Sequence, residues 1–329
     1  MKENMKKNYG GVRKVAKPRG PKTINLLTLK ERFLWLWLDG RSELTERQKS
    51  ELGSVCLFLG PYRNLTTLTS AMLFLHPHCQ VMNHGSRRIT DRRKLNFFMD
   101  YSERKFDKFC QYMIFASQRG MSGGYGGSIA YSHAFSHPEM KMTYTGRYGT
   151  SLLKDRIRCI AWKEPRFISN HIRDNNVDLK GIFRKNAKLR FLLPVRNPID
   201  CAVSNHRVGR AWKPIAERNG QEYTVEYVLE KIMLEFKWFL DLRKEHPGRF
   251  FYFFQDELNK DMLVRLAGFL DLEPERRWIE DSLGCLKVKG GYDHKPEWVE
   301  AFERLQEVFL KDHPEFRARL AGMAPAGKA

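Results

Sequence analysis

The sequence lacks several features that would place it at once in a familiar class of protein. Its six cysteines include no CxxC pair and no Cys/His cluster at zinc-site spacing, so we expect buried free thiols and no bound metal. The apolar cluster at residues 33–38 is far shorter than the roughly 20 residues of a membrane span. No apolar segment of a secretory signal follows the basic start. These absences favour a soluble, cytoplasmic protein.

Acidic residues are also scarce, with 38 Asp and Glu against 58 Lys and Arg, a formal net charge of +20. Such a surface attracts anions, including nucleotides, acidic sugars, nucleic acid and acidic lipid, and charge alone does not choose among them. Residues 1–22 carry eight basic residues against one Glu. We expect a disordered basic tail at 1–22, one domain at 23–320 and a flexible C-terminus at 321–329.

Between these ends, strand and helix patterns alternate. Continuous apolar runs closed by glycine or polar residues are typical of buried parallel strands, and apolar residues three or four apart indicate helices. The glycine-rich residues 119–127 predict a loop. The alternation predicts an α/β fold, a doubly wound parallel sheet flanked by helices. The predicted strands are 54–60, 79–82, 158–162, 189–195 and 250–254, and the predicted helices are 45–52, 66–75, about 91–119, 224–244 and 261–270.

The first candidate site is the loop Gly60-Pro-Tyr-Arg-Asn-Leu-Thr-Thr67, between a predicted strand and a predicted helix. The first N–H groups of a helix have no intrahelical partner and attract a phosphate. Arg63 adds a charge, and Thr66 and Thr67 add hydroxyl donors. The loop is not a Walker A motif, which would need Gly and Lys at Leu65 and Thr66. A plain turn with a threonine-rich helix start is the alternative interpretation.

The second candidate site is Pro194-Val-Arg-Asn-Pro-Ile-Asp-Cys-Ala-Val-Ser204. Arg196 leaves a predicted strand, and Asn197-Pro198 favours a helix start. Ser204 follows about two turns later, at a spacing that would let Arg196 and Ser204 bind one anion together. The alternative is that Arg196 forms a structural ion pair.

Together the two loops resemble the signatures of the PAPS-dependent sulfotransferase family. One signature is similar to PRSGTTLL followed by a helix ending in HP, matched here at Arg63, Thr66, Thr67, Leu68 and His76-Pro77. The other, RNPxDxAxS, is matched by 196–204. Trp162-Lys-Glu-Pro165 is similar to the family's KxP element, and 255–258 with 265–272 resemble its YEDL and FLGL segments. The resemblance covers roughly residues 54–300 and implies a P-loop-like sulfotransferase fold.

The resemblance also implies a reaction, namely transfer of a sulfuryl group from 3'-phosphoadenylyl sulfate (PAPS) to a hydroxyl or amine. It implies that Arg63, Asn64, Leu65, Thr66 and Thr67 hold the 5'-phosphosulfate. Arg196 and Ser204 would hold the 3'-phosphate, and the segment Lys287-Val-Lys-Gly-Gly-Tyr292 would close over the nucleotide through Lys289 and Gly290. Arg63 would also stabilise charge on the leaving phosphate.

The chain departs from the family at the first loop, because members usually have glycine at the position of Leu65 and a small or hydroxyl residue at that of Asn64. A Cβ at position 65 restricts the backbone, so donor binding would be weaker or the loop reshaped. A non-catalytic relative, or one with another donor, is therefore an alternative. A nucleic-acid-binding protein would also explain the charge, but no known recognition motif is present.

A sulfotransferase needs a general base for the acceptor. His84, just past the second strand, is the first candidate, because some family members carry a catalytic Glu or His there and histidine exchanges protons near neutral pH. Lys163 or Glu164, at the KxP strand exit, is the second, while His133 and His137 are candidates for acceptor contacts. Basic and aromatic residues would suit a sugar, phenol, lipid headgroup or peptide equally, so the acceptor stays open; they are Arg87, Arg88, Tyr125 and Trp212.

Overall fold

The computed structural model describes residues 44–119, 126–209, 212–286 and 291–323, which all belong to one compact unit. The expected basic tail at 1–22 and residues 324–329 lie outside the described residues, as do 120–125 of the glycine-rich segment. Also outside the described residues are Lys289 and Gly290, at the centre of the segment expected to cover the nucleotide. The expected domain boundaries therefore stay predictions.

The described residues form a six-stranded sheet with the strand order β3-β2-β4-β1-β5-β6. Five strands are parallel, and only β3 runs antiparallel, where it pairs with the end of β2. Strands alternate with helices along the chain, which confirms the predicted α/β class. The strands are β1 (Ser54–Phe58), β2 (Cys79–Asn83), β3 (Gly127–Ser128), β4 (Cys159–Lys163), β5 (Leu189–Val195) and β6 (Phe250–Phe254).

Burial explains why these strands could be read from the sequence. Every residue of β1, β2 and β4 is buried, as is typical of a parallel sheet covered on both faces, and apolar residues predominate in each strand. The five predicted strands are confirmed to within two residues. The exception is β3: Gly127 and Ser128 pair with β2 although a loop was predicted up to residue 127.

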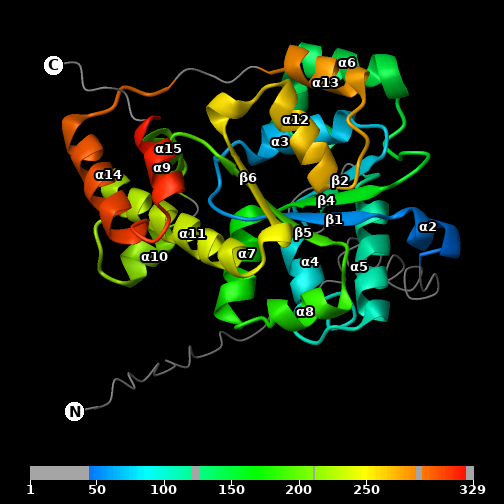
Figure 1. Ribbon diagram of the computed structural model, residues 1–329, viewed down its shortest axis with the longest axis horizontal. Coiled ribbons are helices and arrows are strands. Elements are labelled where there is room, and N and C mark those ends of the chain that lie inside the picture. Colours follow the sequence, from blue (N-terminus) through cyan, green and yellow to red (C-terminus); the bar gives the residue numbers. More distant parts are fainter. Residues whose placement is uncertain (1–43, 120–125, 210–211, 287–290, 324–329) are drawn as a thin grey trace, which may run out of the picture. The chain divides into compact units, whose positions relative to one another are not determined.

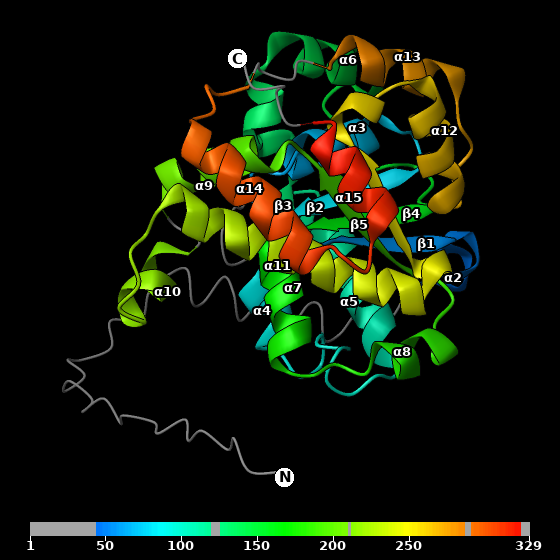
Figure 2. The ribbon, with the colours of Figure 1, turned by 60° about the vertical axis from the view of Figure 1, so that its left-hand side comes forward.

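Helices cover both faces of the sheet (Figures 1 and 2). One face carries α3, α6, α12 and α13, the other α4, α5, α7 and α8, while α9, α11, α14 and α15 lie together beyond β6. The helices are α2 (Glu46–Glu51), α3 (Thr66–Leu75), α4 (Ser86–Thr90), α5 (Glu103–Ala116), α6 (Pro138–Tyr148), α7 (Pro165–Asp174), α8 (Leu179–Lys185), α9 (Pro198–Val208), α10 (Lys213–Arg218), α11 (Val225–Glu245), α12 (Lys260–Phe269), α13 (Arg276–Gly284), α14 (Pro296–Phe309) and α15 (Pro314–Ala321). Short 3₁₀ turns are η2 (Ile129–Tyr131), η3 (His133–Ser136), η4 (Pro247–Arg249) and η5 (Gln255–Glu257).

Helix α3 coincides with the predicted helix 66–75, and α2, α11 and α12 differ from their predictions by one residue at each end. The prediction of one helix over 91–119 is wrong. Helix α5 begins only at Glu103, where the Ser102 side chain caps it by accepting from Lys105 N. The preceding residues turn irregularly and bury Phe97 and Phe98, whose rings stack 4.2 Å apart. Two adjacent buried rings do not have the three- or four-residue spacing of a helix. Their tertiary packing therefore overrides the helix-forming tendency of the residues around them.

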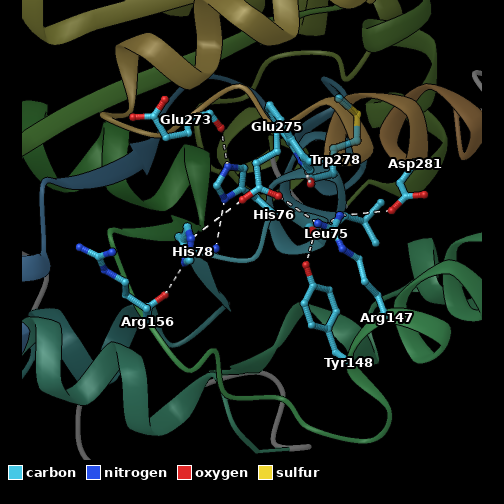
Figure 3. A network of polar contacts seen from close by, with 11 residues as sticks. Leu75, His76, His78, Arg147, Tyr148, Arg156, Glu273, Glu275, Trp278 and Asp281 are labelled. Atoms are coloured by element: carbon cyan, nitrogen blue, oxygen red, sulfur yellow. Dashed lines mark hydrogen bonds and ion pairs between the residues drawn. The ribbon is translucent and has the colours of Figure 1, made fainter.

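At the C-terminal end of α3, polar side chains form a saturated network (Figure 3). The carbonyl of Leu75 accepts from Tyr148 Oη at 2.6 Å and from Arg147 Nη1 at 3.4 Å. Arg147 also bonds Glu275 and Asp281, which ties α6 and the end of α3 to α13. The network satisfies carbonyls that a helix end leaves without partners.

His76, the first residue of the His-Pro pair, belongs to the same network (Figure 3). Its Nε2 lies 2.9 Å from the carbonyl oxygen of Glu273, and its Nδ1 accepts from His78 N at 3.1 Å. Both ring nitrogens are therefore used in holding the chain, and burial lowers the pKa of His76 to about 4. The pair has a structural role at this end of the sheet.

Two further observations concern the sequence predictions. All six cysteines are buried and unpaired, which confirms the expected free thiols. In the part of the chain that the structure describes, no helix has the length and apolar character needed to cross a bilayer.

Candidate functional site

The candidate residues come from the carboxyl ends of four neighbouring strands. In the order β2-β4-β1-β5 these strands run parallel, so the segments that follow them leave the sheet along one edge. Along that edge lie His84 after β2, Lys163 and Glu164 at the end of β4, the loop 60–65 after β1, and Arg196 after β5. The strand order therefore gathers residues separated by up to 136 positions in the printed sequence. Ligands of open parallel sheets bind at this edge.

The loop after β1 has an unusual backbone. Gly60, Arg63 and Leu65 all have positive φ, of 93°, 62° and 59°. Glycine is required at position 60, because a Cβ there would lie 2.4 Å from Leu193 Cδ1. Leu65 adopts the left-handed conformation that glycine allows freely, so the loop keeps that backbone despite the substitution. Leucine in this region is strained by roughly 1–2 kcal/mol.

The N-terminus of α3 is left without a capping side chain. Leu65 is the N-cap residue and forms no side-chain cap bond, whereas Thr45, Ser102 and Thr224 cap their helices with side-chain oxygens. The first-turn N–H groups of α3 are therefore available to an anion, which the helix dipole also favours. Thr66 is buried and Thr67 is partly exposed at this helix start.

Asn64 joins the two candidate loops. Its side chain is fully buried, with Nδ2 donating to the carbonyl of Pro194 and Oδ1 accepting from Arg196 N at 2.8 Å. These bonds use both ends of the amide. Asn64 therefore positions the second loop against the first.

The side chains of the two loops also meet. Arg63 Nε donates to Ser204 Oγ at 2.8 Å, so the exposed guanidinium of the first loop reaches the second turn of α9. Arg196 Nη2 lies 3.5 Å from Asp200 Oδ2, and Arg196 Nε is buried without a hydrogen-bond partner among the described residues. Cys201 lies between the two arginines: burial raises the pKa of its thiol to about 12, while Arg196 and Arg63 lower it. Ser204 thus bonds Arg63 in the structure, and the expectation that it binds one anion together with Arg196 stays a prediction.

The last residue of the expected nucleotide-covering segment, Tyr292, and the nearby His294 are bonded to the same helix. Asp200 Oδ1 accepts from Tyr292 N at 2.8 Å and lies 2.9 Å from His294 Nε2. The Tyr292 ring lies against Arg207 and Arg196, whose Cζ atoms are 4.4 and 5.7 Å from its centroid. This arrangement places the polypeptide on the carboxyl side of Lys289 and Gly290 beside Arg196.

His84 lies at the other end of the edge and contacts a buried carboxylate. Its Nδ1 is 3.2 Å from Glu164 Oε2, and the side chains are 39% and 7% exposed. Glu164 Oε1 accepts from the hydroxyl of Tyr62 at 3.0 Å. The carbonyl of His84 accepts from Trp162 Nε1 at 2.8 Å, which holds the backbone of a residue with φ of 62°. Among the described residues, His84 Nε2 has no hydrogen-bond partner, so the ring is oriented by Glu164 and keeps one nitrogen free.

Lys163 and His133 lie near the middle of the edge. Lys163 is buried; burial lowers its pKa, Glu164 raises it, and Arg63 lowers it further. Burial also lowers the pKa of His133, and the charges of Arg63 and Lys163 act in the same direction. His133 belongs to η3, and His137 is the N-cap of α6.

The sequence matches the family model described as the sulfotransferase domain over residues 55–283, which is most of the chain. The chain belongs to the sulfotransferase domain family. Among solved structures, the sulfotransferase domain resembles the sulfotransferase STF9 from Mycobacterium avium at 13% identity and a TM-score of 0.43, with 86% of this chain and 80% of that chain covered. A search of curated protein sequences found no match.

Membership of this family gives the P-loop-like sulfotransferase fold and sulfotransfer as the general activity of the domain. Some residues that shape the site were not anticipated from sequence. Two of them are Tyr62, inside the first loop, and Asn205, which follows the second signature directly and donates from Nδ2 to the carbonyl of Tyr62 at 2.7 Å. Their roles depend on contacts between segments about 140 residues apart, which no local pattern encodes.

Proposed function

We propose that the protein transfers a sulfuryl group from PAPS to a hydroxyl or amine of an acceptor. The observation that carries this proposal is the junction of the two signature loops, where Arg63 bonds Ser204 and Asn64 bonds the backbone of Arg196. A donor with phosphates at both ends of its ribose needs two anion sites at a fixed separation. Two loops held together by such bonds supply two guanidinium groups and one uncapped helix N-terminus.

Different residues at this edge would bind different parts of the donor. The N–H groups at the start of α3, with Arg63, Thr66 and Thr67, would hold the phosphosulfate, and Arg196 and Ser204 the 3'-phosphate. Lys289 and Gly290 would close over the nucleotide from the segment fastened by Asp200. The buried Arg196 Nε without a partner fits this assignment, because such a donor is normally satisfied by a ligand or water.

PAPS supplies an activated sulfuryl group, and the chain's own residues supply position, charge and a base. Arg63 would stabilise negative charge on the leaving phosphate oxygen. His84 would accept the acceptor's proton at Nε2, while Glu164 holds Nδ1 and stabilises the imidazolium that forms. Tyr62 fixes Glu164 by donating to its other oxygen. Lys163 is the second candidate for the base, since burial lowers its pKa.

Thermal-shift titration of the full chain tests the donor assignment. We expect adenosine 3',5'-bisphosphate (PAP) to raise the melting temperature at concentrations where AMP, which lacks the 3'-phosphate, has no effect. Stabilisation by ATP with Mg²⁺ and not by PAP would indicate a kinase-like donor. Stabilisation by none of the three would identify a relative that has lost donor binding at the strained Leu65 loop.

A further inference from the structure

One face of helix α9 carries a cation that the proposed function does not use. Asp200, Ser204 and Arg207 follow one another at intervals of four and three residues, so their side chains lie along one side of the helix. Ser204 is proposed to bind the 3'-phosphate, and Arg207 comes one turn later. Arg207 is exposed, and among the described residues it has no carboxylate or hydrogen-bond partner. Its charge is therefore available to a ligand.

The ring of Tyr292 connects Arg207 with Arg196, the arginine assigned to the same phosphate. The Cζ atoms of Arg207 and Arg196 lie 4.4 and 5.7 Å from the ring centroid, so the two guanidinium groups are at most about 10 Å apart. A cation over a tyrosine ring is attracted to its face, which restricts the movement of a flexible arginine. Tyr292 therefore holds both guanidinium groups on the side of α9 that carries Ser204.

The position of Tyr292 is itself fixed by the protein. Its N–H donates to Asp200 Oδ1 at 2.8 Å, and the same oxygen lies 2.9 Å from His294 Nε2. Gly291 packs so closely that a Cβ there would lie 3.1 Å from Asp200 Oδ2. Helix α14, which begins two residues after His294, packs against α9 (Figures 1 and 2). The ring therefore has a defined place beside α9 that does not depend on a ligand.

The carboxylate of Asp200 offsets the charge of Arg196. Arg196 Nη2 lies 3.5 Å from Asp200 Oδ2, and the two side chains are only 13% and 6% exposed. Arg196 Nε is buried without a partner among the described residues and can still donate, but the ion pair contributes little net charge. A phosphate monoester carries about two negative charges at pH 7. Since Arg63 is assigned to the phosphosulfate, Arg207 is the cation of this helix face that can balance the 3'-phosphate.

We infer that Arg207 binds the 3'-phosphate of the donor together with Arg196 and Ser204, and that Tyr292 positions the two guanidinium groups for it. Arg207 thereby determines the preference of the protein for a nucleotide that carries a 3'-phosphate. Because the ring restricts both arginines before the donor arrives, less side-chain entropy is lost on binding. The inference rests on the proposed function and adds a residue to its donor site.

Calorimetric titration of the full chain at about 0.15 M salt tests the inference without an acceptor. The probes are PAP and AMP, which differ only in the 3'-phosphate. We expect the unsubstituted protein to bind PAP at least about a hundredfold more tightly than AMP. Arg207→Gln should reduce this ratio about tenfold and leave the AMP affinity and the melting temperature unchanged, because the side chain is exposed. Arg207→Lys should keep part of the ratio, since it retains the charge without the planar fork.

Two variants of Tyr292 test its positioning role. Tyr292→Leu should reduce the ratio about threefold, since both guanidinium groups lose the ring. Tyr292→Phe, the conservative variant, should restore the ratio, because the ring makes the contact. The matched control is Arg243→Gln, which should leave the ratio unchanged. Arg243 is also exposed and lies over a tyrosine ring, with Cζ 4.9 Å from the centroid of Tyr252, but it belongs to the last turn of α11.

Three results would overturn the inference: an unchanged ratio in Arg207→Gln, an equal loss of PAP and AMP affinity in that variant, or an effect no larger than that of Arg243→Gln. Equal losses in Tyr292→Phe and Tyr292→Leu would overturn the positioning role of the ring. A preference for PAP that does not depend on Arg207 would reject the inference and retain the donor assignment. No preference for PAP in the unsubstituted protein would reject the donor assignment, and the inference with it.

Discussion

The same types of residue have different roles at the two edges of the sheet, where the parallel strands end and where they begin. At the carboxyl edge, His84 has one nitrogen on Glu164 and is 39% exposed, and α3 begins at an uncapped, strained N-terminus. At the opposite edge, His76 is fully buried with both nitrogens bonded, and α3 ends with its Leu75 carbonyl satisfied twice. Unused hydrogen-bonding capacity therefore marks the edge that we propose binds the substrates, and saturated networks mark the edge that holds the fold.

This contrast predicts that the two edges respond oppositely to substitution, and the largest effect is expected at His84. His84→Ala should lower the rate of sulfuryl transfer by about 10³-fold, within the range for loss of a general base. Stability and PAP affinity should stay unchanged, because the side chain is partly exposed and bonds Glu164, which is not one of the residues assigned to the donor. Turnover assays with PAP thermal shifts on the same preparation measure both quantities. Near-normal turnover would remove His84 from the mechanism and direct attention to Lys163.

His76, at the opposite edge, should instead make the free energy of unfolding depend on pH. His76 has a folded-state pKa of about 4, lowered by burial from about 6.5 in the unfolded chain, so the unfolded state binds the proton first. Stability should therefore be complete above pH 6.5 and fall by up to about 3 kcal/mol as the pH falls toward 4. Urea unfolding between pH 4.5 and 7 measures this slope. His76→Gln, which does not titrate, should flatten it, and an unchanged slope would assign the dependence to other groups.

Removing the cation at the end of α3 should have a somewhat smaller effect, and again on stability alone. Arg147→Ala deletes the bonds to Leu75, Glu275 and Asp281 and should lower the free energy of unfolding by about 2 kcal/mol. Chemical denaturation measures the loss, and PAP titration well below the transition checks the site. A weaker PAP affinity in the folded variant would show that the two edges are coupled through α3.

The smallest effect is expected at Leu65, the strained residue of the carboxyl edge. Leu65→Gly places the residue without a Cβ at φ of 59° and should raise the free energy of unfolding by up to about 1 kcal/mol, since relief of strain exceeds the entropy that glycine adds to the unfolded chain. PAP affinity should rise or stay equal. Leu68→Gly, inside α3, is the control and should destabilise the protein. Destabilisation by Leu65→Gly would mean that the leucine side chain contributes packing that outweighs the strain.

The sequence predicted well wherever one segment carries its own signal. Continuous apolar runs identified β1, β5 and β6, and a period of three to four residues identified α3 and α11. It failed at 91–102, where the burial of Phe97 and Phe98 has no helical period, and at β3, where two residues form a strand only because β2 lies beside them. Signals that arise from packing between distant segments are absent from local sequence.

The same division holds for the site. By itself the sequence determined the α/β architecture, the two loops with their arginines, and the resemblance to sulfotransferases, because each depends on residues close together in the chain. Only the tertiary structure decided that Ser204 meets Arg63, that Asn64 joins the loops, and that Glu164 orients His84. The strand order β2-β4-β1-β5 brings these groups to one edge, and hydrogen-bond geometry acts over distances of a few ångströms that spacing in the sequence does not specify.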